Sequence, residues 1–280
     1  MLDSATVRVL GRADEPEAAA LLDSDPVSNV FVASRLQASG LDPSRAGGEV
    51  WGFVDDGRLV SLCYSGANLV PVAAGPAAVE AFAERALRQG RRCSSLVGPA
   101  ESVLPLWDLL RPHWGRAREV RAVQPLMVIS GPPAVPPDPQ VRPVRPEEID
   151  RLLPASIAMF TEEVGVSPVG DDGGVLYRAR VAELVRAGRA LARFEDGEVL
   201  FKAEIGAATR LACQVQGVWV RPDRRGEGIS VAGMSAVVEL ARRHVAPVVT
   251  LYVNDYNLAA LAAYRHVGFR EAGTFASVLF

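Results

Sequence analysis

The sequence predicts an α/β protein made of two similar halves. Short apolar runs typical of strands alternate along the chain with longer stretches typical of helices, which is the pattern of α/β folds. Each half also carries an Asp-Gly pair between two apolar runs, at Asp56-Gly57 and at Asp196-Gly197, and this pair is a strong signal of a tight β-hairpin. Because strands and helices follow the same order in both halves, we interpret the chain as a diverged duplication.

Length and composition fit two ordinary globular domains. The chain has 280 residues, of which 49% are hydrophobic and 22% are charged, and its formal net charge is −3. A mildly acidic balance argues against a protein that binds nucleic acid through bulk positive charge. Asp3 stands where a secretory signal would carry positive charge, and no apolar run reaches 18 residues. We therefore expect a soluble cytoplasmic protein that contacts neither nucleic acid nor a membrane.

Cysteine and histidine are few and widely spaced. No CxxC pair and no histidine pair with metal-ligand spacing occurs, so we expect no metal site and no disulfide. Buried small hydrophobic residues in a reducing compartment are the simplest interpretation of the cysteines. The residues concerned are Cys63, Cys93, Cys213, His113, His244 and His266.

The halves are separated by a proline-rich stretch. GPPAVPPDPQ has no hydrophobic periodicity, and we expect domains at 1–131 and 141–280 joined by an extended linker at 132–140. In the first domain we expect strands at 69–74 and 93–97 and helices at 76–89 and 101–110. In the second we expect strands at 213–220 and 248–253 and helices at 229–244 and 258–266.

A glycine-rich loop opens the helix at 229–244. Its sequence, RRGEGIS, places Gly226 and Gly228 behind two arginines, and a glycine-rich turn before a helix suits phosphate because it offers free N–H groups. Neither common nucleotide motif fits, since the only lysine is Lys202 and Val231 stands where a dinucleotide loop needs a third glycine or alanine. The equivalent stretch of the first half, AAGPAAV, has one glycine and no arginine. We therefore expect phosphate binding in the second half alone.

A second pattern follows the strand at 248–253. Asn257, Ala260 and Tyr264 are followed by Gly268-Phe269, and together with the glycine-rich loop they resemble the acetyl-CoA signature of the GNAT N-acetyltransferase family. The resemblance covers 142–280, and over 1–130 it extends only to the order of elements. It implies two tandem GNAT-like domains, each a mixed, mostly antiparallel twisted sheet flanked by helices, with a degenerate first copy. Ser230 departs from the family pattern, which has glycine or alanine there.

The resemblance implies how acetyl-CoA binds. The loop would hold the pyrophosphate, and the main chain of the strand ending at Val220 would pair with the pantetheine arm and hold the oxyanion. No metal is implied. The residues assigned to acetyl-CoA binding are Val218, Trp219, Val220, Arg225, Gly226, Glu227, Gly228, Ile229, Ser230, Asn254, Asn257, Ala260 and Tyr264.

The resemblance also implies the catalytic groups. Tyr264 is the candidate acid that protonates the departing thiolate, and Glu162, Glu163 and Glu204 are candidate bases for the attacking amine. A water relay is the alternative base, and each glutamate also fits a solvated surface position. The function implied is transfer of an acetyl group to a primary amine of a small molecule or peptide. An amide-forming acyltransferase of thiol or cell-envelope metabolism and a non-catalytic CoA-binding module are the alternatives.

Overall fold

The computed structural model describes residues 5–280, which form two compact units. The first unit comprises the chain up to Met127 together with Tyr252–Asn257 and Glu271–Phe280, and the second comprises Val128–Leu251 and Leu258–Arg270. Asp3 lies outside the described residues. Among the described helices, none is long and apolar enough to cross a bilayer.

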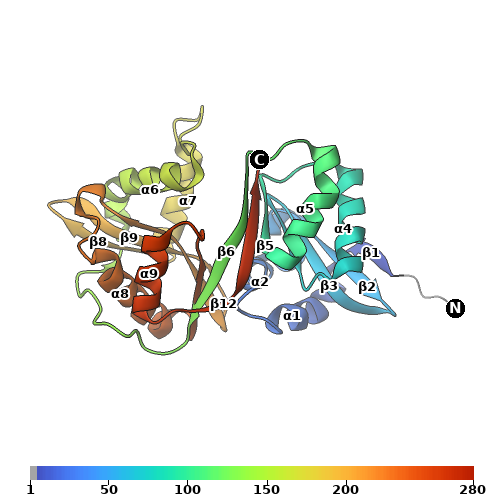
Figure 1. Cartoon of the computed structure of the whole chain (residues 1–280), viewed down its shortest axis with the longest axis horizontal. Helices are drawn as coiled ribbons and strands as arrows, with labels where there is room; N and C mark the ends of the chain where they lie inside the picture. Colours follow the sequence, from blue (N-terminus) through green and yellow to red (C-terminus); the bar gives the residue numbers. More distant parts are fainter. Residues whose placement is uncertain (1–4) are drawn as a thin grey trace. The chain divides into compact units, whose positions relative to one another are not determined.

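The first unit is a twisted, largely antiparallel sheet covered by helices (Figure 1). Its strands lie in the order β1-β2-β3-β4-β5-β12-β6, and the pair β4–β5 is parallel. Its elements are β1 (Thr6–Val9), η1 (Arg12–Asp14), α1 (Glu15–Asp23), α2 (Val30–Ser39), α3 (Pro43–Ala46), β2 (Glu49–Asp55), β3 (Arg58–Ser65), β4 (Asn68–Val72), α4 (Pro76–Gln89), β5 (Ser95–Pro99), α5 (Ala100–Trp114), most of β6 (Glu119–Ile129) and most of β12 (Arg270–Leu279).

Successive side chains of a strand point to opposite faces of the sheet, and in the first unit the buried side chains form an apolar layer on each face. On one face, Trp51 and Cys63 pack in a cluster with Phe82 of α4 and Leu106 of α5. On the other face, neighbouring strand residues such as Leu62 pack with residues of α1 and α2. Helices α4 and α5 therefore cover one face of the sheet, and helices α1 and α2 cover the other.

The second unit repeats this plan. Its strands lie in the order β11-β10-β9-β8-β7, and the pair β10–β11 is parallel while the others are antiparallel. Its elements are β7 (Arg142–Pro143), η2 (Pro146–Glu148), α6 (Ile149–Val164), α7 (Val175–Arg186), β8 (Ala190–Glu195), β9 (Glu198–Ala208), β10 (Ala212–Val220), η3 (Pro222–Arg224), α8 (Ile229–His244), most of β11 (Val248–Tyr252) and α9 (Leu258–Val267).

The expected duplication is confirmed element by element. The series β2-β3-β4-α4-β5-α5 of the first unit matches the series β8-β9-β10-α8-β11-α9 of the second in order and in strand direction. Both Asp-Gly turns also form as expected: Asp56 and Gly57 have φ of 45° and 73°, and Asp196 and Gly197 have φ of 53° and 85°. Positive φ at both central residues is the mark of the tight hairpin turn.

The C-terminal strand belongs to the first unit, whereas the sequence analysis placed 270–280 with the second domain. β12 runs antiparallel to β5, with Phe275 opposite Pro99 and Leu279 opposite Ser95. The physical reason is apolar burial, because Ala276 and Val278 are fully buried in the same cluster as Phe82 and Leu106.

The proline-rich segment is fixed to the second unit and is not a free spacer. It has no helix or strand, in keeping with its composition, but its backbone is hydrogen-bonded to the helices beside it. The Ala134 N–H donates to Val267 O at 2.8 Å, the Asp138 N–H donates to Ala232 O at 3.0 Å, and Arg193 pairs with the Asp138 carboxylate at 2.9 Å. The segment therefore lies against α8 and α9.

All three cysteines are free and buried. Burial raises the pKa of the Cys63 thiol strongly and that of the Cys93 thiol less, and it raises the pKa of Cys213 to about 12. A thiol that stays protonated at neutral pH is a poor nucleophile. The three cysteines are therefore buried, as we expect for small core residues.

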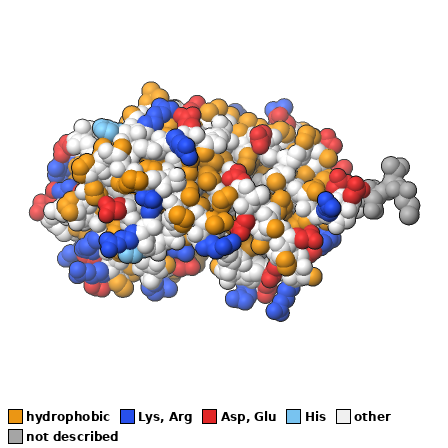
Figure 2. All heavy atoms as spheres, turned by 90° about the horizontal axis from the view of Figure 1, so that it is seen from below, with side chains coloured by type: hydrophobic (Ala, Val, Ile, Leu, Met, Phe, Trp, Pro, Cys, Tyr) orange, Lys and Arg blue, Asp and Glu red, His pale blue; other side chains and the backbone are white. Residues whose placement is uncertain are grey.

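Acidic and basic side chains are interspersed on the surface. The chain has 33 acidic and 30 Lys or Arg residues. Figure 2 shows both signs side by side on the drawn face of each unit. Such mixing does not create the single-sign field that steers a polyanion toward a protein.

Candidate functional site

The candidate site of the second unit begins where β10 separates from β11. The two strands pair in parallel at three positions, from Ala212 opposite Val248 to Gln214 opposite Thr250. Beyond Gln214, β10 continues to Val220 paired only with β9. A strand with one unpaired edge presents free backbone N–H and C=O groups, which can pair with an extended ligand.

A β-bulge turns the unpaired edge of β10. Gln216 lies opposite Glu204 and Trp219 lies opposite Lys202, so β10 has one residue more than β9 between these positions. Gly217 sits in the bulge with φ of 60°, a backbone conformation that glycine adopts readily. The Arg221 N–H donates to Leu200 O at 3.0 Å, so by antiparallel alternation the polar backbone groups of Val220 face away from β9. Val218, two residues earlier, lies at the bulge itself.

The loop after β10 presents a row of free amides. Gly226 has φ of 84° and Gly228 has φ of 79°, and Gly228 caps the start of α8. The N–H groups of 226–230 donate no hydrogen bond within residues 5–280. A Cβ at Gly226 or Gly228 would meet nothing within 4 Å, so glycine is required here by the backbone angle and not by crowding. Free amides at a helix N-terminus attract phosphate.

Ion pairs hold this loop in place. Arg225 Nη2 lies 2.7 Å from Glu162 Oε2 of α6, and Arg225 Nε donates to Val220 O at 3.0 Å. Arg224 pairs with Glu195 of the β8–β9 hairpin at 2.6 Å and with Glu227 at 2.9 Å. The loop is therefore tied to three neighbouring elements while its amides stay open.

Tyr264 of α9 is buried with a free hydroxyl. The side chain is 7% exposed, and its ring packs against Phe269 at 5.9 Å between ring centroids. Its hydroxyl forms no hydrogen bond with any residue in 5–280. Burial raises the pKa of Tyr264 strongly, and the nearby Glu163 carboxylate raises it further. The phenol therefore stays protonated at neutral pH, as a general acid must.

Glu204 lies beneath the bulge of β10 and is paired with Lys202. The Lys202 ammonium donates to Glu204 Oε1 at 2.7 Å and to Gly217 O at 3.1 Å, and both side chains are almost fully buried. A Cβ placed on Gly217 would lie 3.3 Å from the Glu204 carboxylate, so this carboxylate borders the bulge directly. A buried carboxylate requires such a partner, because an unpaired buried charge is strongly destabilising.

The neighbouring glutamates of α6 differ in their contacts. Glu162 accepts from Trp219 Nε1 at 3.1 Å as well as from Arg225, and so it bridges the bulged strand and the loop. Glu163 is exposed and is close enough to Tyr264 to act on its ionisation. Glu162 therefore anchors the loop, while the charge of the Glu163 carboxylate acts on the pKa of Tyr264.

The remaining predicted cofactor residues lie around the start of α9. Asn254 and Asn257 precede α9 in the segment grouped with the first unit, where Gln124 Nε2 donates to Asn254 Oδ1 at 2.9 Å and the Asn257 N–H donates to Asn254 O at 3.0 Å. Ala260 lies in the first turn of α9 itself. Ile229 and Ser230 form the first turn of α8.

Sequence reasoning missed two residues beside Glu204. Lys202 was considered only as a missing phosphate-loop lysine, although its i, i+2 spacing from Glu204 on a strand places both side chains on one face. Tyr177 of α7 donates its hydroxyl to Ser156 O at 2.8 Å, and its pKa is raised by burial and then by Glu204. No local pattern in the sequence marks Tyr177.

Among residues 5–280, no group of three His, Cys, Asp or Glu side chains is arranged to hold a metal ion.

Two regions of the chain match known families. Residues 171–269 match the Acetyltransferase (GNAT) family, and residues 48–152 match a domain of unknown function, DUF4081. No curated protein matches the sequence. The first match contains β10, the glycine-rich loop, α8 and α9, which carry the geometry described above.

Solved structures share the fold over nearly the whole chain. A GCN5-related N-acetyltransferase from Sphaerobacter thermophilus is 20% identical with a TM-score of 0.60, and covers 99% of this chain and 95% of its own. A GNAT-family acetyltransferase from Colwellia psychrerythraea is 13% identical with a TM-score of 0.58, at 98% and 99% coverage. A tandem GNAT protein from the clavulanic acid biosynthesis pathway is 15% identical with a TM-score of 0.53, at 98% of both chains. The chain therefore shares the fold of these GNAT and tandem GNAT structures, and residues 171–269 are similar to the Acetyltransferase (GNAT) family.

Proposed function

We propose that this chain is an acetyl-CoA-dependent N-acetyltransferase that transfers the acetyl group to a primary amine of a small molecule or peptide by direct attack. We further propose that the second unit, Val128–Leu251 with Leu258–Arg270, is the catalytic domain expected at 141–280, and that residues 1–131 are a degenerate copy. The proposal is supported by one observation: the N–H groups of 226–230 are open, and the unpaired edge of β10 lies directly before them.

We assign acetyl-CoA, the acetyl donor, to the glycine-rich loop and the end of β10. The amides of 226–230 would bind the pyrophosphate, and the loop is anchored so that little order has to be gained on binding. Val218 and the N–H of Val220 would pair with the pantetheine arm, as one strand does with another, while Val220 O accepts from Arg225 Nε at 3.0 Å. Asn254, Asn257 and Ala260 complete the assignment that the family pattern suggests. No step of the proposed chemistry requires a metal.

The reaction joins the amine nitrogen to the acetyl carbon and breaks the bond from that carbon to sulfur. A backbone N–H at the bulge of β10 would stabilise the oxyanion of the tetrahedral intermediate. Tyr264 would give its phenolic proton to the departing thiolate, because it is protonated and its hydroxyl is otherwise unused. The amine must lose a proton to attack, since free alkylamines have a pKa of about 10.

We assign the removal of that proton to Glu163, acting through water or directly. Glu162 contacts Arg225 and Trp219, Glu204 contacts Lys202, and Glu163 has interactions of its own, so the choice rests on position and not on a free carboxylate. Glu163 is exposed where an acceptor can reach it and lies near Tyr264. Glu204 and Tyr177 would then border the acceptor side of the bulge.

Two measurements on the full chain test the proposal. Calorimetric titration with acetyl-CoA should show saturable binding, and a panel of primary amines should yield at least one acceptor that releases thiol in the presence of acetyl-CoA. Binding without thiol release from any amine would favour a non-catalytic CoA-binding module, and absence of binding would contradict the loop assignment.

The matched pair Glu163→Gln and Glu162→Gln tests the base assignment. The first variant should lower kcat and flatten its pH dependence, while the second should raise KM for acetyl-CoA because it releases Arg225. Equal effects of both variants on kcat would remove Glu163 from the proposed role.

A further inference from the structure

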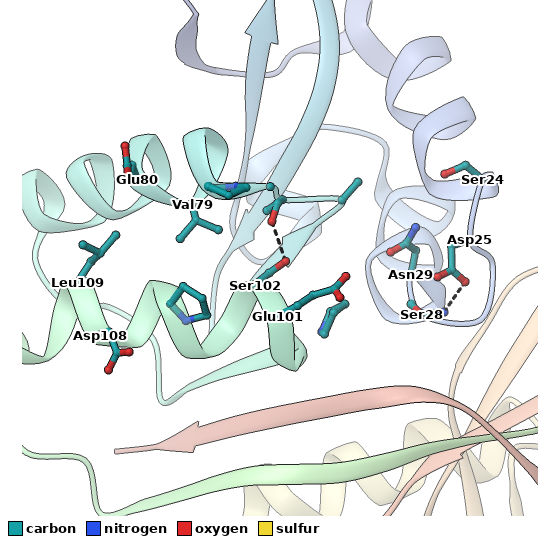
Figure 3. Close-up of a pocket in the computed structure, with 16 residues that line it drawn as sticks. Ser24, Asp25, Ser28, Asn29, Val79, Glu80, Glu101, Ser102, Asp108 and Leu109 are labelled. Carbon is teal, nitrogen blue, oxygen red and sulfur yellow. Dashed lines mark hydrogen bonds between the residues drawn. The ribbon is translucent and has the colours of Figure 1, made fainter.

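The first unit contains a cavity that the proposed acetyl transfer does not use (Figure 3). It has a volume of about 850 Å³ and lies between the starts of α4 and α5 and the turn at 24–29 that precedes α2. In element order it holds the place that the glycine-rich loop holds in the second unit. Its size is that of a small-molecule site.

Four carboxylates border the cavity, and Figure 3 shows that Glu80 and Asp108 are directed outward from α4 and α5. Asp25, Glu80, Glu101 and Asp108 line the cavity, and none of the lining residues is Lys, Arg or His. Within residues 5–280, neither Glu80 nor Glu101 forms an ion pair, and Asp108 has only an exposed pair with Arg111 at 3.5 Å. Asp25 Oδ1 accepts from the N–H groups of Val27 and Ser28 at 3.2 and 3.0 Å. Glu80, Glu101 and Asp108 still leave the lining net negative against the two helix starts, which together contribute about one positive charge. The cavity therefore favours a cation and repels phosphate.

Asn29 adds an unused acceptor at the cavity. The residue is 5% exposed, and its Nδ2 donates to Leu22 O at 3.2 Å, which fixes the orientation of the amide. Its Oδ1 accepts no hydrogen bond from any residue in 5–280. Figure 3 shows this oxygen turned toward the helices across the cavity. An acceptor that opens onto the cavity and receives no protein donor can accept from an N–H group of a ligand.

The space between the carboxylates is apolar. Val79 of α4 and Leu109 of α5 face the cavity, as Figure 3 shows, and Leu109 is 42% exposed. Pro76, Pro99 and Pro105 contribute further apolar wall without a backbone donor. The lining therefore alternates acceptors with hydrocarbon.

We propose that this cavity binds a small organic cation with two or more ammonium groups joined by an apolar stem. Ammonium groups carry donors and no acceptor, which matches a wall of carboxylates and a free amide oxygen. Methylene groups between them match Val79, Leu109 and the prolines. The site goes beyond acetyl transfer and does not depend on it, because all of its residues lie in the first unit.

Spermidine is the probe for this site, titrated into the full chain by calorimetry at low ionic strength. We expect saturable one-to-one binding that weakens as salt is added, because the charges are exposed. Glu80→Arg and Glu101→Arg should each weaken the affinity about tenfold, since each removes one exposed attraction and adds a repulsion.

Glu84→Arg is the matched control. Glu84 lies one turn further along α4 than Glu80 and does not line the cavity. Its replacement by Arg changes the net charge by the same amount as Glu80→Arg. Its affinity for spermidine should stay within about twofold of the parent, and circular dichroism should show all three variants folded. If Glu80→Arg and Glu84→Arg weaken spermidine binding equally, the loss reflects the net charge of the protein, and the proposed site is wrong. Absence of saturable binding to the parent chain would overturn it as well, and if Glu80→Arg does not fold, Glu80→Gln against Glu84→Gln decides.

Discussion

Tyr264 combines a buried ring with a hydroxyl that no residue in 5–280 uses. A core tyrosine normally finds a hydrogen-bond partner, so the free hydroxyl favours a chemical role over a packing role. We predict that Tyr264→Phe lowers kcat by about 10²–10⁴, the usual contribution of general acid catalysis, because only the proton is removed. Steady-state kinetics with a saturating acceptor measure this.

The same variant carries its own controls. Affinity for acetyl-CoA should change little, because the ring that packs against Phe269 is retained. The unfolding midpoint should also be preserved, since no protein hydrogen bond is lost. A kcat within about twofold of the parent while chemistry limits the rate would show that water delivers the proton.

Gly228 is the residue on which the geometry of the loop depends. Its φ of 79° is strained for any side chain that has a Cβ, although no protein atom stands within 4 Å of that position. We predict that Gly228→Val weakens acetyl-CoA binding at least tenfold, because the amides at the start of α8 turn away from the phosphate position. Isothermal titration measures the loss.

Gly115→Val is the control for backbone strain. Gly115 follows α5 with φ of 80° and is equally free of neighbours, but it lies in the first unit. Both variants should lose a similar amount of stability, about 1–3 kcal/mol. If Gly115→Val lowers acetyl-CoA affinity as much as Gly228→Val, the loss reports general destabilisation and the loop is not the binding site.

Residue-scale features were predictable where a local rule fixes them. Gly226, Gly228 and the two Asp-Gly turns require positive φ, and the sequence shows this directly. The partnership of Lys202 with Glu204 and the position of Tyr177 were not predicted, because they depend on which strand and helix faces meet. The engagement of Glu162 by Arg225 and Trp219 likewise joins residues 57 or more positions apart.

At the scale of elements, the start of α6 depends on one ion pair. Arg142 of β7 binds Glu148 through both carboxylate oxygens, at 2.7 and 2.8 Å, and the Arg145 N–H donates to the same carboxylate at 2.9 Å. Arg142 lowers the pKa of Glu148 to about 2. The unfolded chain has a glutamate pKa of about 4.3, so the pair stabilises the fold above that pH and less as pH falls toward 2.

We predict that Glu148→Gln destabilises the protein by about 1–2 kcal/mol at pH 7 and progressively less below pH 4. Chemical denaturation across this range measures the difference from the parent. Glu147→Gln is the control, because Glu147 is exposed and adjacent, and it should show no such trend. A difference that stays constant from pH 7 to pH 3 would mean that the ion pair does not set the stability of this helix start.

A helix could be predicted from the sequence where its amphipathic pattern and the residue that starts it agree. The expected helices at 76–89 and 229–244 match α4 and α8 at both ends, because Pro76 or Gly228 starts each helix. The strand expected at 213–220 differs from β10 by one residue. Helix α7 was not anticipated, because exposed apolar residues such as Val175 and Leu176 blur its amphipathic pattern. The partner of β12 was not anticipated either, because pairing between distant strands leaves no mark in a local pattern.

At the scale of the molecule, the C-terminal strand completes the sheet of the first unit. Val278 is fully buried among residues of α4 and α5, and Phe280 packs against Trp107 at 5.5 Å between ring centroids. We predict that Val278→Ala costs about 2 kcal/mol and speeds amide exchange in β5, its neighbour in the sheet. Thr274→Ala, at an exposed position of the same strand, should leave that exchange unchanged. Faster exchange confined to the second unit would contradict this placement.

The two units should differ in their response to acetyl-CoA although they share one plan. In the first unit, Pro76 removes a backbone donor from the start of α4, and Glu80 and Glu101 place negative charge where phosphate would lie. In the second, the corresponding loop has free amides and no carboxylate on them other than Glu227, which is paired with Arg224. We predict that titration gives a stoichiometry of one acetyl-CoA per chain, with an affinity that Glu80→Arg retains and Gly228→Val weakens at least tenfold. A second equivalent, or a crystal structure in excess acetyl-CoA with cofactor held by residues 71–79, would show that the first unit kept the binding that its charges are expected to oppose.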